Sequence, residues 1–278
     1  MSVAGNDRFR RRFGPWALIT GASAGLGAEF ARQLAARGLD LVLVARSVER
    51  LRKVADEVEV THGVTTRTLS VDLSRPAFLP TLADATDDLD LGLLVSNAGG
   101  DGLRPFFHVP LDEVDGMLHL NTRSHVLLAR HVGGRILDAG RAGGLLLVAS
   151  TAGLQPTPLI ANYSSSKAYL IHFAQALRWE TRGTGLRVVV SLPGPTETPG
   201  LVESSGIDLT KLPAPMKPGP VVERALRALE VDRPVDIPGA TNRAMAFLGR
   251  RLLPMRWTTA LWGFLMQRIA PPFDGDVR

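Results

Sequence analysis

The sequence predicts an α/β protein in which a parallel sheet is covered by helices on both faces. Short apolar runs alternate with helical segments, which is typical of βαβ units. Residues 39–45 and 186–192 are almost continuously apolar, as expected of strands buried on both faces. Strands are expected at 16–20, 39–45, 67–72, 91–96, 144–150 and 186–192, with a short seventh near 234–237.

A glycine-rich turn follows the first expected strand. It runs from Gly21 to Gly27 and leads into a helical stretch at 28–37. Strand, glycine turn and helix in this order predict a dinucleotide-binding turn, because the helix N-terminus offers free N–H groups to phosphates. Gly21 permits the tight turn, Gly25 lets the backbone approach a pyrophosphate, and Gly27 allows close helix–strand packing. The alternative is an ordinary βα turn.

The second expected strand ends at Arg46 and Ser47 rather than at an acidic residue. In dinucleotide-binding folds an acid near this point binds the ribose 2′-hydroxyl of NAD, whereas an arginine accommodates the 2′-phosphate of NADP. Arg46 therefore favours NADP(H) over NAD(H), with Ser47 as a neighbouring hydroxyl donor. The alternative is a solvated arginine at a strand end.

Tyr163 and Lys167 are separated by one turn of an expected helix, so their side chains share one face. A phenol has a pKa of about 10, and a neighbouring ammonium lowers it. The pair therefore suits general acid–base chemistry on an alcohol or a carbonyl. The alternative is a half-buried tyrosine beside a surface lysine.

Further motifs follow in a fixed order, and together they resemble the short-chain dehydrogenase/reductase superfamily over about residues 15 to 235. The stretch from Thr20 to Gly27 matches the T-G-x-x-x-G-x-G turn of that superfamily. The other matching motifs are Asp72 in Val71-Asp72-Leu73, Asn97-Ala98-Gly99, Asn121, Ser150, Tyr163, Lys167 and Pro193-Gly194. One departure is Ser96, at a position where asparagine is frequent.

The resemblance implies a Rossmann-type doubly wound parallel sheet and four catalytic residues. Tyr163 would be the general acid in reduction, and Lys167 would lower its pKa and hold the nicotinamide ribose. Ser150 would hydrogen-bond the substrate oxygen. Asn121 would hold a water or a backbone carbonyl in a proton relay.

The same resemblance supplies the cofactor-binding residues. Asp72 would contact the adenine, the Asn97 motif would border the cofactor, and Pro193 and Gly194 would lie beside the nicotinamide. The full expected set is Thr20, Gly21, Ser23, Ala24, Gly25, Leu26, Gly27, Arg46, Ser47, Asp72, Leu73, Asn97, Ala98, Gly99, Tyr163, Lys167, Pro193, Gly194, Thr196 and Thr198.

We expect three segments: a basic N-terminal arm at 1–14, the dinucleotide-binding and catalytic domain at 15–240, and an amphipathic helical extension at 241–278. The extension should form two helices broken at Pro254. Neither helix reaches the roughly 20 apolar residues of a membrane span. We favour docking of these helices on the enzyme body or a second subunit. The alternative is peripheral membrane contact, because Trp, Phe and Leu with Arg are typical of interfacial helices.

We expect substrate specificity to be determined by two variable stretches, 151–160 and 197–220. The second is apolar and rich in proline, which is consistent with a lid over a hydrophobic pocket. We therefore expect a lipophilic carbonyl substrate, such as a fatty acyl, steroid-like or aryl ketone.

The composition excludes several classes of protein. The chain of 278 residues has no cysteine, which rules out disulfides, zinc–thiolate sites and thiol catalysis. No metal site is expected, and His119 and His125 are expected on a helix surface or an interface. The formal charge is +5, and the arginines are scattered apart from a cluster at Arg8–Arg12 and the pair Arg250-Arg251. We therefore expect an electropositive cofactor cleft and no nucleic-acid surface. No signal peptide is expected, and the expected location is the cytoplasm.

The sequence thus predicts an NADP(H)-dependent oxidoreductase that interconverts a lipophilic ketone and its secondary alcohol, as a homodimer or homotetramer. One alternative is a non-catalytic NADP(H)-binding sensor or scaffold. Another is a membrane-surface enzyme of lipid metabolism.

Overall fold

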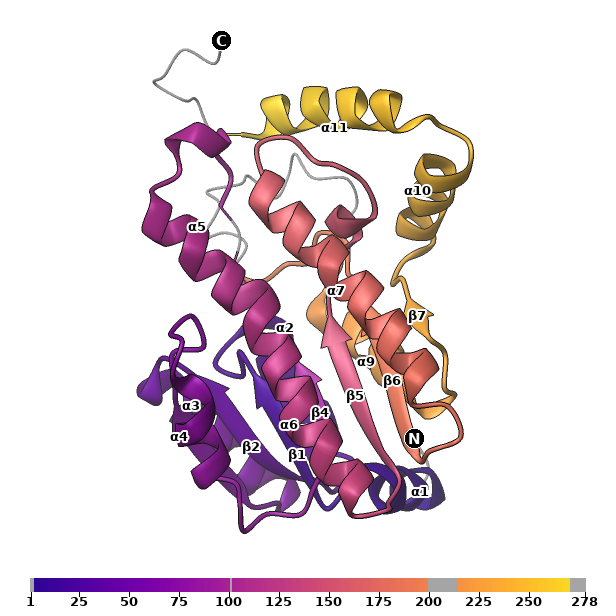
Figure 1. Cartoon of the computed structure of the whole chain (residues 1–278). Coiled ribbons are helices and arrows are strands. Elements are labelled where there is room, and N and C mark those ends of the chain that lie inside the picture. The colour runs from indigo at the N-terminus through magenta and orange to yellow at the C-terminus, as the bar shows by residue number, and fades with distance from the viewer. Residues whose placement is uncertain (1–2, 101, 200–214, 271–278) are drawn as a thin grey trace.

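A computed structural model describes residues 3–100, 102–199 and 215–270 of the chain. Within these ranges the strands form one parallel sheet in the order β3-β2-β1-β4-β5-β6-β7 (Figure 1). The strands are β1 (Trp16–Thr20), β2 (Asp40–Ala45), β3 (Thr66–Ser70), β4 (Leu91–Ser96), β5 (Gly143–Val148), β6 (Leu186–Ser191) and β7 (Val235–Asp236). All seven expected strands are confirmed; β1 and β4 have the expected bounds, and the ends of the others differ by at most two residues.

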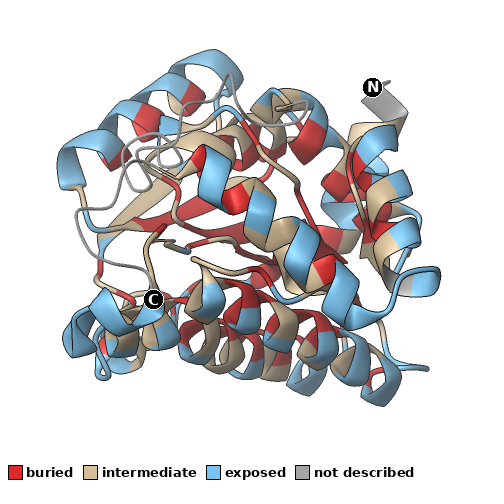
Figure 2. Ribbon diagram, turned by 90° about the horizontal axis from the view of Figure 1, so that it is seen from above, coloured by how far each residue is buried: buried red, intermediate tan, exposed pale blue. Residues whose placement is uncertain are grey.

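Helices cover both faces of this sheet, and Figure 2 shows the buried strands between them. The helices of the sheet domain are α2 (Gly25–Ala35), α3 (Val48–His62), α4 (Phe78–Asp84), α5 (Leu111–Leu118), α6 (Ser124–Asp138), α7 (Ala161–Glu180) and α9 (Pro218–Glu230). Shorter turns lie at η1 (Phe106–His108), η2 (His119–Arg123) and η3 (Thr151–Leu154). The strand order reverses between β1 and β4, and ligands of doubly wound sheets bind at such a switch point, outside the carboxyl ends of the strands.

The core is divided by the sheet, because successive strand residues point to opposite faces. On β5, Leu146 and Val148 pack in the cluster with α2, α3 and α9. Leu145 and Leu147 pack in the other cluster with α6 and α7. Full burial of a Leu or Val side chain stabilises the fold by roughly 1.5–3 kcal/mol. Continuous apolar strands are therefore what this two-sided packing requires.

The basic N-terminal segment forms a helix, α1 (Val3–Phe13), that packs against the domain. Phe9 and Phe13 are buried. Their ring centroids lie 4.7 Å apart. Gly144 of β5 leaves room for Phe13, since a Cβ there would lie 3.0 Å from that ring. The guanidinium groups of Arg12 and Arg187 lie over the same ring.

The C-terminal region forms α10 (Ala240–Arg251) and α11 (Met255–Ile269), with the expected break at Pro254. Figure 1 shows α11 lying across the end of the molecule toward which β5 points. One face of α11 packs on the body, where Met266 and Ile269 form a buried cluster with Leu103. In the described ranges, no helix is both long and apolar enough to span a membrane.

Candidate functional site

The four expected catalytic residues come from three neighbouring parts of the fold. Asn121 lies in η2, which is a π-helical turn between α5 and α6. Ser150 follows the carboxyl end of β5 and caps η3, its Oγ accepting a hydrogen bond from the Ala152 N–H at 3.2 Å. Tyr163 and Lys167 lie in the first turns of α7.

Lys167 is anchored at the end of β5. Its side chain is buried, and Nζ donates to the Val148 carbonyl oxygen at 3.2 Å. The same Nζ lies 5.7 Å from the centroid of the Tyr163 ring, which is partly exposed. The structure therefore places a buried ammonium beside a phenol that can reach solvent or substrate.

Gly153 allows the turn after Ser150 to touch α7. A Cβ at Gly153 would lie 2.6 Å from the carbonyl carbon of Lys167 and 2.7 Å from the Ala168 nitrogen. Real side chains do not make such contacts with backbone, so this position requires glycine. Sequence reasoning missed Gly153, although a glycine between Ser150 and Tyr163 was a visible signal.

Asn121 is fully buried, and its side chain connects two segments. Its Oδ1 accepts from the Gly100 N–H at 2.9 Å, and its Nδ2 donates to the Gly100 carbonyl at 2.8 Å. Nδ2 also lies 3.2 Å from Ser166 Oγ on α7. The backbone carbonyl that Asn121 holds is therefore that of Gly100.

Thr20 joins the carboxyl ends of β1 and β4. Its hydroxyl accepts hydrogen bonds from the N–H groups of Asn97 and Ala98, each at 2.9 Å. Asn97 Nδ2 donates to the Thr20 carbonyl, also at 2.9 Å. A Cβ at Gly99 would lie 3.1 Å from Lys167 Nζ, so the loop passes directly beside that ammonium.

His125 is buried beneath this loop, so its expected surface or interface position is wrong. Nε2 lies 2.9 Å from the Ala98 carbonyl oxygen, and Nδ1 lies 2.8 Å from Ser96 Oγ. Burial lowers the pKa of His125 to about 3, and the charge of Lys167 acts in the same direction. The ring is therefore neutral, with Nε2–H donating to Ala98 and Nδ1 accepting from Ser96.

In the sequence, the pair of Ser96 and His125 was indicated by the serine at position 96, where asparagine is frequent. A serine at a strand end does not show which residue it bonds to. His119, in contrast, is partly exposed, and its Nδ1 lies 3.3 Å from the Asp115 carboxylate. Among the described residues, no group of three or more His, Asp or Glu is arranged to hold a metal ion.

The glycine turn has backbone conformations and close contacts that require glycine. Gly21 and Gly25 have φ of 67° and 55°, values that favour glycine. A Cβ at Gly27 would lie 2.0 Å from the Gly21 carbonyl oxygen. The N-cap of α2 is Ala24, which supplies no side-chain hydrogen bond to the first helical turn. Open backbone at a helix N-terminus fits a phosphate group.

Two further expected cofactor residues lie in the same glycine turn. Ser23 and Leu26 are partly buried within it. A Cβ at Gly25 would lie 3.0 Å from Thr198 Cγ2, so the turn and the segment after β6 approach each other closely.

Arg46 directly follows β2, and Asp72 lies two residues after the end of the neighbouring strand β3. Asp72 Oδ1 accepts from the N–H and Oγ of Ser74 at 3.0 and 2.6 Å. Burial acts to raise the pKa of Asp72, but the Ser74 hydrogen bonds and the charges of Arg46 and Arg75 lower it overall. Arg46 is exposed, and its position leaves the guanidinium accessible to a phosphate.

Two other expected cofactor residues have structural partners. Ser47 is the N-cap of α3, and its Oγ accepts from the Arg50 N–H at 3.3 Å. Leu73 is buried in the core.

The turn at Pro193 and Gly194 contacts η3, the turn that follows Ser150, and it also contacts α10. The Thr151 N–H donates to the Pro193 carbonyl at 2.9 Å, and Thr196 Oγ1 donates to the Gly194 carbonyl at 3.0 Å. A Cβ at Gly194 would lie 2.4 Å from Asn242 Nδ2. Asn242, in the expected C-terminal extension, thus packs on this turn, a contact that sequence reasoning missed.

Of the two expected substrate stretches, 151–160 is described, whereas most of 197–220 is not, because residues 200–214 lie outside the described ranges. Leu159 has φ of 66°, and its carbonyl accepts from the Arg104 N–H at 3.0 Å. Leu159 and Ile160 pack against the buried cluster of Leu103 and α11. This side of the site is therefore apolar.

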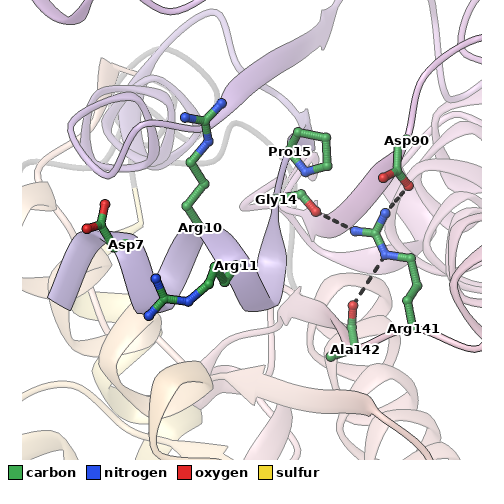
Figure 3. Close-up of a pocket in the computed structure, with 8 residues that line it drawn as sticks. All are labelled: Asp7, Arg10, Arg11, Gly14, Pro15, Asp90, Arg141 and Ala142. Atoms are coloured by element: carbon green, nitrogen blue, oxygen red, sulfur yellow. Dashed lines mark hydrogen bonds and ion pairs between the residues drawn. The ribbon is translucent and has the colours of Figure 1, made fainter. Parts of the chain in front are cut away.

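A separate cavity of about 550 Å³ lies at the opposite edge of the sheet (Figure 3). Pro15, Asp90 and Ala142 line it, and they precede β1, β4 and β5. Arg141 also lines this cavity and bonds to Asp90 and to the Gly14 carbonyl. Because the expected catalytic residues are at the carboxyl ends of the strands, this cavity is not part of their site.

Comparisons with known proteins show which family the chain is similar to. A family model for short chain dehydrogenases matches residues 15–206. The chain is 35% identical over 196 residues to the very-long-chain 3-oxoacyl-CoA reductase-A of Danio rerio, a match that covers 69% of this chain and 61% of that protein. The match thus spans about six tenths of that relative's length.

Solved structures resemble nearly the whole chain. One, from a study of 7beta-hydroxysteroid dehydrogenase stereoselectivity, has a TM-score of 0.84 and 26% identity, covering 91% of this chain and 98% of that one. A short-chain dehydrogenase from Sphingobium yanoikuyae, solved with NADPH, has a TM-score of 0.78 and 32% identity, covering 95% of this chain and 99% of that one.

The family model thus covers β1 to β6, the glycine turn and the segment that carries Ser150, Tyr163 and Lys167. With the doubly wound fold and relatives above 30% identity, this match means that the chain belongs to the short chain dehydrogenase family.

Proposed function

We propose that this protein is an NADP(H)-dependent oxidoreductase that interconverts a lipophilic ketone and its secondary alcohol, with Tyr163 as the acid/base. The observation that carries the proposal is that Ser150 follows the carboxyl end of β5, where buried Lys167 is bonded to Val148, and that the Tyr163 ring centroid lies 5.7 Å from Lys167 Nζ. The glycine turn from Gly21 to Gly27 follows the carboxyl end of β1, so it lies at the same end of the strands as Ser150.

Each residue has a role that its position supports. Ser150 Oγ hydrogen-bonds the substrate oxygen and stabilises the charge that develops there. Tyr163 gives its proton to this oxygen in reduction and accepts it in oxidation. Lys167 holds positive charge near the phenol, and Asn121 keeps the Gly100 loop in place. The nicotinamide cofactor supplies or accepts the hydride.

The preference for NADP(H) rests on Arg46. Its guanidinium is exposed beside Asp72 at the edge where the adenosine ribose would bind. An arginine here offers a charge-assisted hydrogen bond to a 2′-phosphate.

The substrate class rests on the apolar side of the site and on the relatives. Leu103, Leu159 and Ile160 pack together with α11 on this side. The matched proteins are described as a very-long-chain 3-oxoacyl-CoA reductase and a 7beta-hydroxysteroid dehydrogenase. We transfer to this chain only their shared chemistry, a ketone or alcohol on a large apolar group.

For the assembly we propose a homodimer or homotetramer in the cytoplasm, in which a second copy covers the face of η2 and α7. A cavity of about 490 Å³ opens there, with Tyr169 half exposed at its edge. Its lining residues are Leu118, Thr122, Arg123, Val126, Leu127, Ser165, Ser166 and Tyr169.

The deciding experiment is NADPH oxidation by purified protein with a panel of lipophilic ketones and beta-ketoacyl thioesters. The proposal expects turnover in the wild type, a preference for NADPH over NADH, and a loss of at least about a hundredfold in Tyr163→Phe. Cofactor binding should survive this substitution. Tight NADPH binding with no turnover on the whole panel would instead favour the sensor or scaffold alternative.

A further inference from the structure

The corner between α10 and α11 exposes eight large apolar side chains. Residues 251–257 are all exposed, in a segment that includes two leucines, a methionine and a tryptophan. The apolar side chains of this surface are between 44% and 69% exposed. We call these residues the α10–α11 surface: Phe247, Leu248, Leu252, Leu253, Met255, Trp257, Leu261 and Phe264.

The two faces of α11 differ in their environment. Trp257, Leu261 and Phe264 recur at helical spacing and are exposed. Thr258, buried Met266 and Ile269 face the body of the protein. Docking of α11 on the enzyme therefore leaves a second apolar face that nothing in the described chain covers.

The charged side chains of residues 240–270 are all positive. Residues 240–270 contain five arginines and no acidic residue, a charge equal to the formal net charge of +5 for the whole chain. Two of the arginines lie beside the exposed aromatic rings: Arg256 is 5.9 Å from the centroid of Trp257, and Arg268 is 4.2 Å from that of Phe264. The apolar surface and the positive charge thus occupy the same corner.

A second copy of the chain is a poor partner for this corner. A two-fold contact places the same patch on both sides, so arginines would face arginines with no carboxylate from residues 240–270 to pair with them. An anionic lipid surface satisfies both properties, because Trp, Phe and Leu enter the headgroup boundary while Arg binds lipid phosphates.

We propose that the α10–α11 surface docks the protein on anionic lipid bilayers as a peripheral contact. The inner face of α11 packs on Leu159 and Ile160 of the expected substrate stretch. Docking therefore leaves α11 between the lipid and that apolar side of the site, which brings the site close to where a lipophilic substrate is concentrated. Lipid binding itself requires no turnover, so its test is independent of the proposed function.

The test is flotation of the full chain with vesicles of phosphatidylcholine, alone or with about one third phosphatidylglycerol. The wild type should bind the anionic vesicles at least about tenfold more strongly than the neutral ones, and salt should weaken this binding. The double variant Trp257→Ser/Phe264→Ser should lose at least about tenfold in binding. Arg256→Gln/Arg268→Gln should lose a similar factor on anionic vesicles only.

The matched control is Val60→Ser/Val231→Ser, which removes two exposed apolar side chains elsewhere and should bind as the wild type does. Circular dichroism and thermal unfolding establish that each variant is folded. Failure of the wild type to bind anionic vesicles at low salt would overturn the proposal, as would unchanged binding of folded Trp257→Ser/Phe264→Ser. Light scattering adds a third criterion: conversion of an oligomer to monomers by that double variant would assign the surface to a subunit contact instead.

Discussion

Ser96 Oγ lies 2.8 Å from Nδ1 of His125, and both side chains are fully buried under the loop that begins at Asn97. The opposite ring nitrogen holds the Ala98 carbonyl at 2.9 Å. His125 follows Asn121 by one helical turn, so one helical segment holds the loop at both Ala98 and Gly100. The serine at position 96 is therefore one part of a two-residue support for this loop.

Removal of the Ser96 hydroxyl should destabilise the fold. Ser96→Ala leaves Nδ1 of His125 buried without a donor, and we expect a loss of about 1–3 kcal/mol in the free energy of unfolding. Urea denaturation measures this loss. The control is Ser124→Ala, which removes a buried hydroxyl that donates only to a carbonyl in the same helical segment, at Leu120. Equal, small losses in both variants would contradict the prediction.

The free energy of unfolding of the wild type should decrease as the pH is lowered, because of His125. The pKa of His125 is lowered in the folded protein from 6.5 to about 3. Below about pH 6.5 the unfolded chain therefore binds a proton that the folded chain does not, and stability decreases as the pH falls. This group alone should contribute a slope of about 1.4 kcal/mol per pH unit down to about pH 3.

His125→Gln removes this titration. The stability advantage of the wild type over the variant should therefore shrink between about pH 6 and pH 5 by about 1.2 kcal/mol. Denaturant unfolding of both proteins at the two pH values measures the difference. A difference that stays constant with pH would show that His125 titrates normally.

Arg46→Gln should change the choice of cofactor. If Arg46 binds the 2′-phosphate, the variant loses a charge-assisted hydrogen bond, and the dissociation constant for NADPH should rise roughly 10- to 100-fold. Affinity for NADH should stay the same. Fluorescence titration with both cofactors tests this, with Arg52→Gln on α3 as the exposed control. A parallel loss of NADPH and NADH affinity would argue against a 2′-phosphate contact.

Gly153→Ala should disturb the contact between η3 and α7. The added methyl group would lie under 3 Å from the Lys167 backbone. We expect about 1–3 kcal/mol of destabilisation and a lower kcat, because Ser150 and Tyr163 are displaced relative to each other. Gly116→Ala is the control: a Cβ there meets nothing within 4 Å, and alanine favours the helix. Wild-type stability and kcat in Gly153→Ala would refute the role given to this glycine.

Tyr169→Arg tests the proposed subunit contact. Tyr169 is half exposed at the 490 Å³ cavity and stacks on Phe173, so it can pack against a second copy. An arginine there would meet its symmetry mate and repel it. Light scattering should report smaller assemblies for Tyr169→Arg and unchanged ones for Val60→Arg. An unchanged mass for both would place the contact elsewhere.

Local features of the sequence were sufficient to predict much of the fold and of the candidate site. The seven strands followed from apolar runs, because burial on both faces of a parallel sheet requires continuous hydrophobicity. The turn from Gly21 to Gly27 and the pair Tyr163 and Lys167 were visible because their geometry is set within a few residues. The break at Pro254 followed from the same kind of local rule.

The tertiary structure alone decided the contacts between residues distant in sequence. His125 was expected on a surface, and only packing of α6 against β4 brings it to Ser96, 29 residues earlier. The contacts of Gly153 with α7 and of Asn242 with Gly194 likewise exist only once the elements pack. The same holds for α11, whose amphipathic sequence fixes two faces, while the fold determines which is buried and which remains exposed. Periodicity and motifs report local geometry, whereas burial of a particular side chain depends on every element that packs around it.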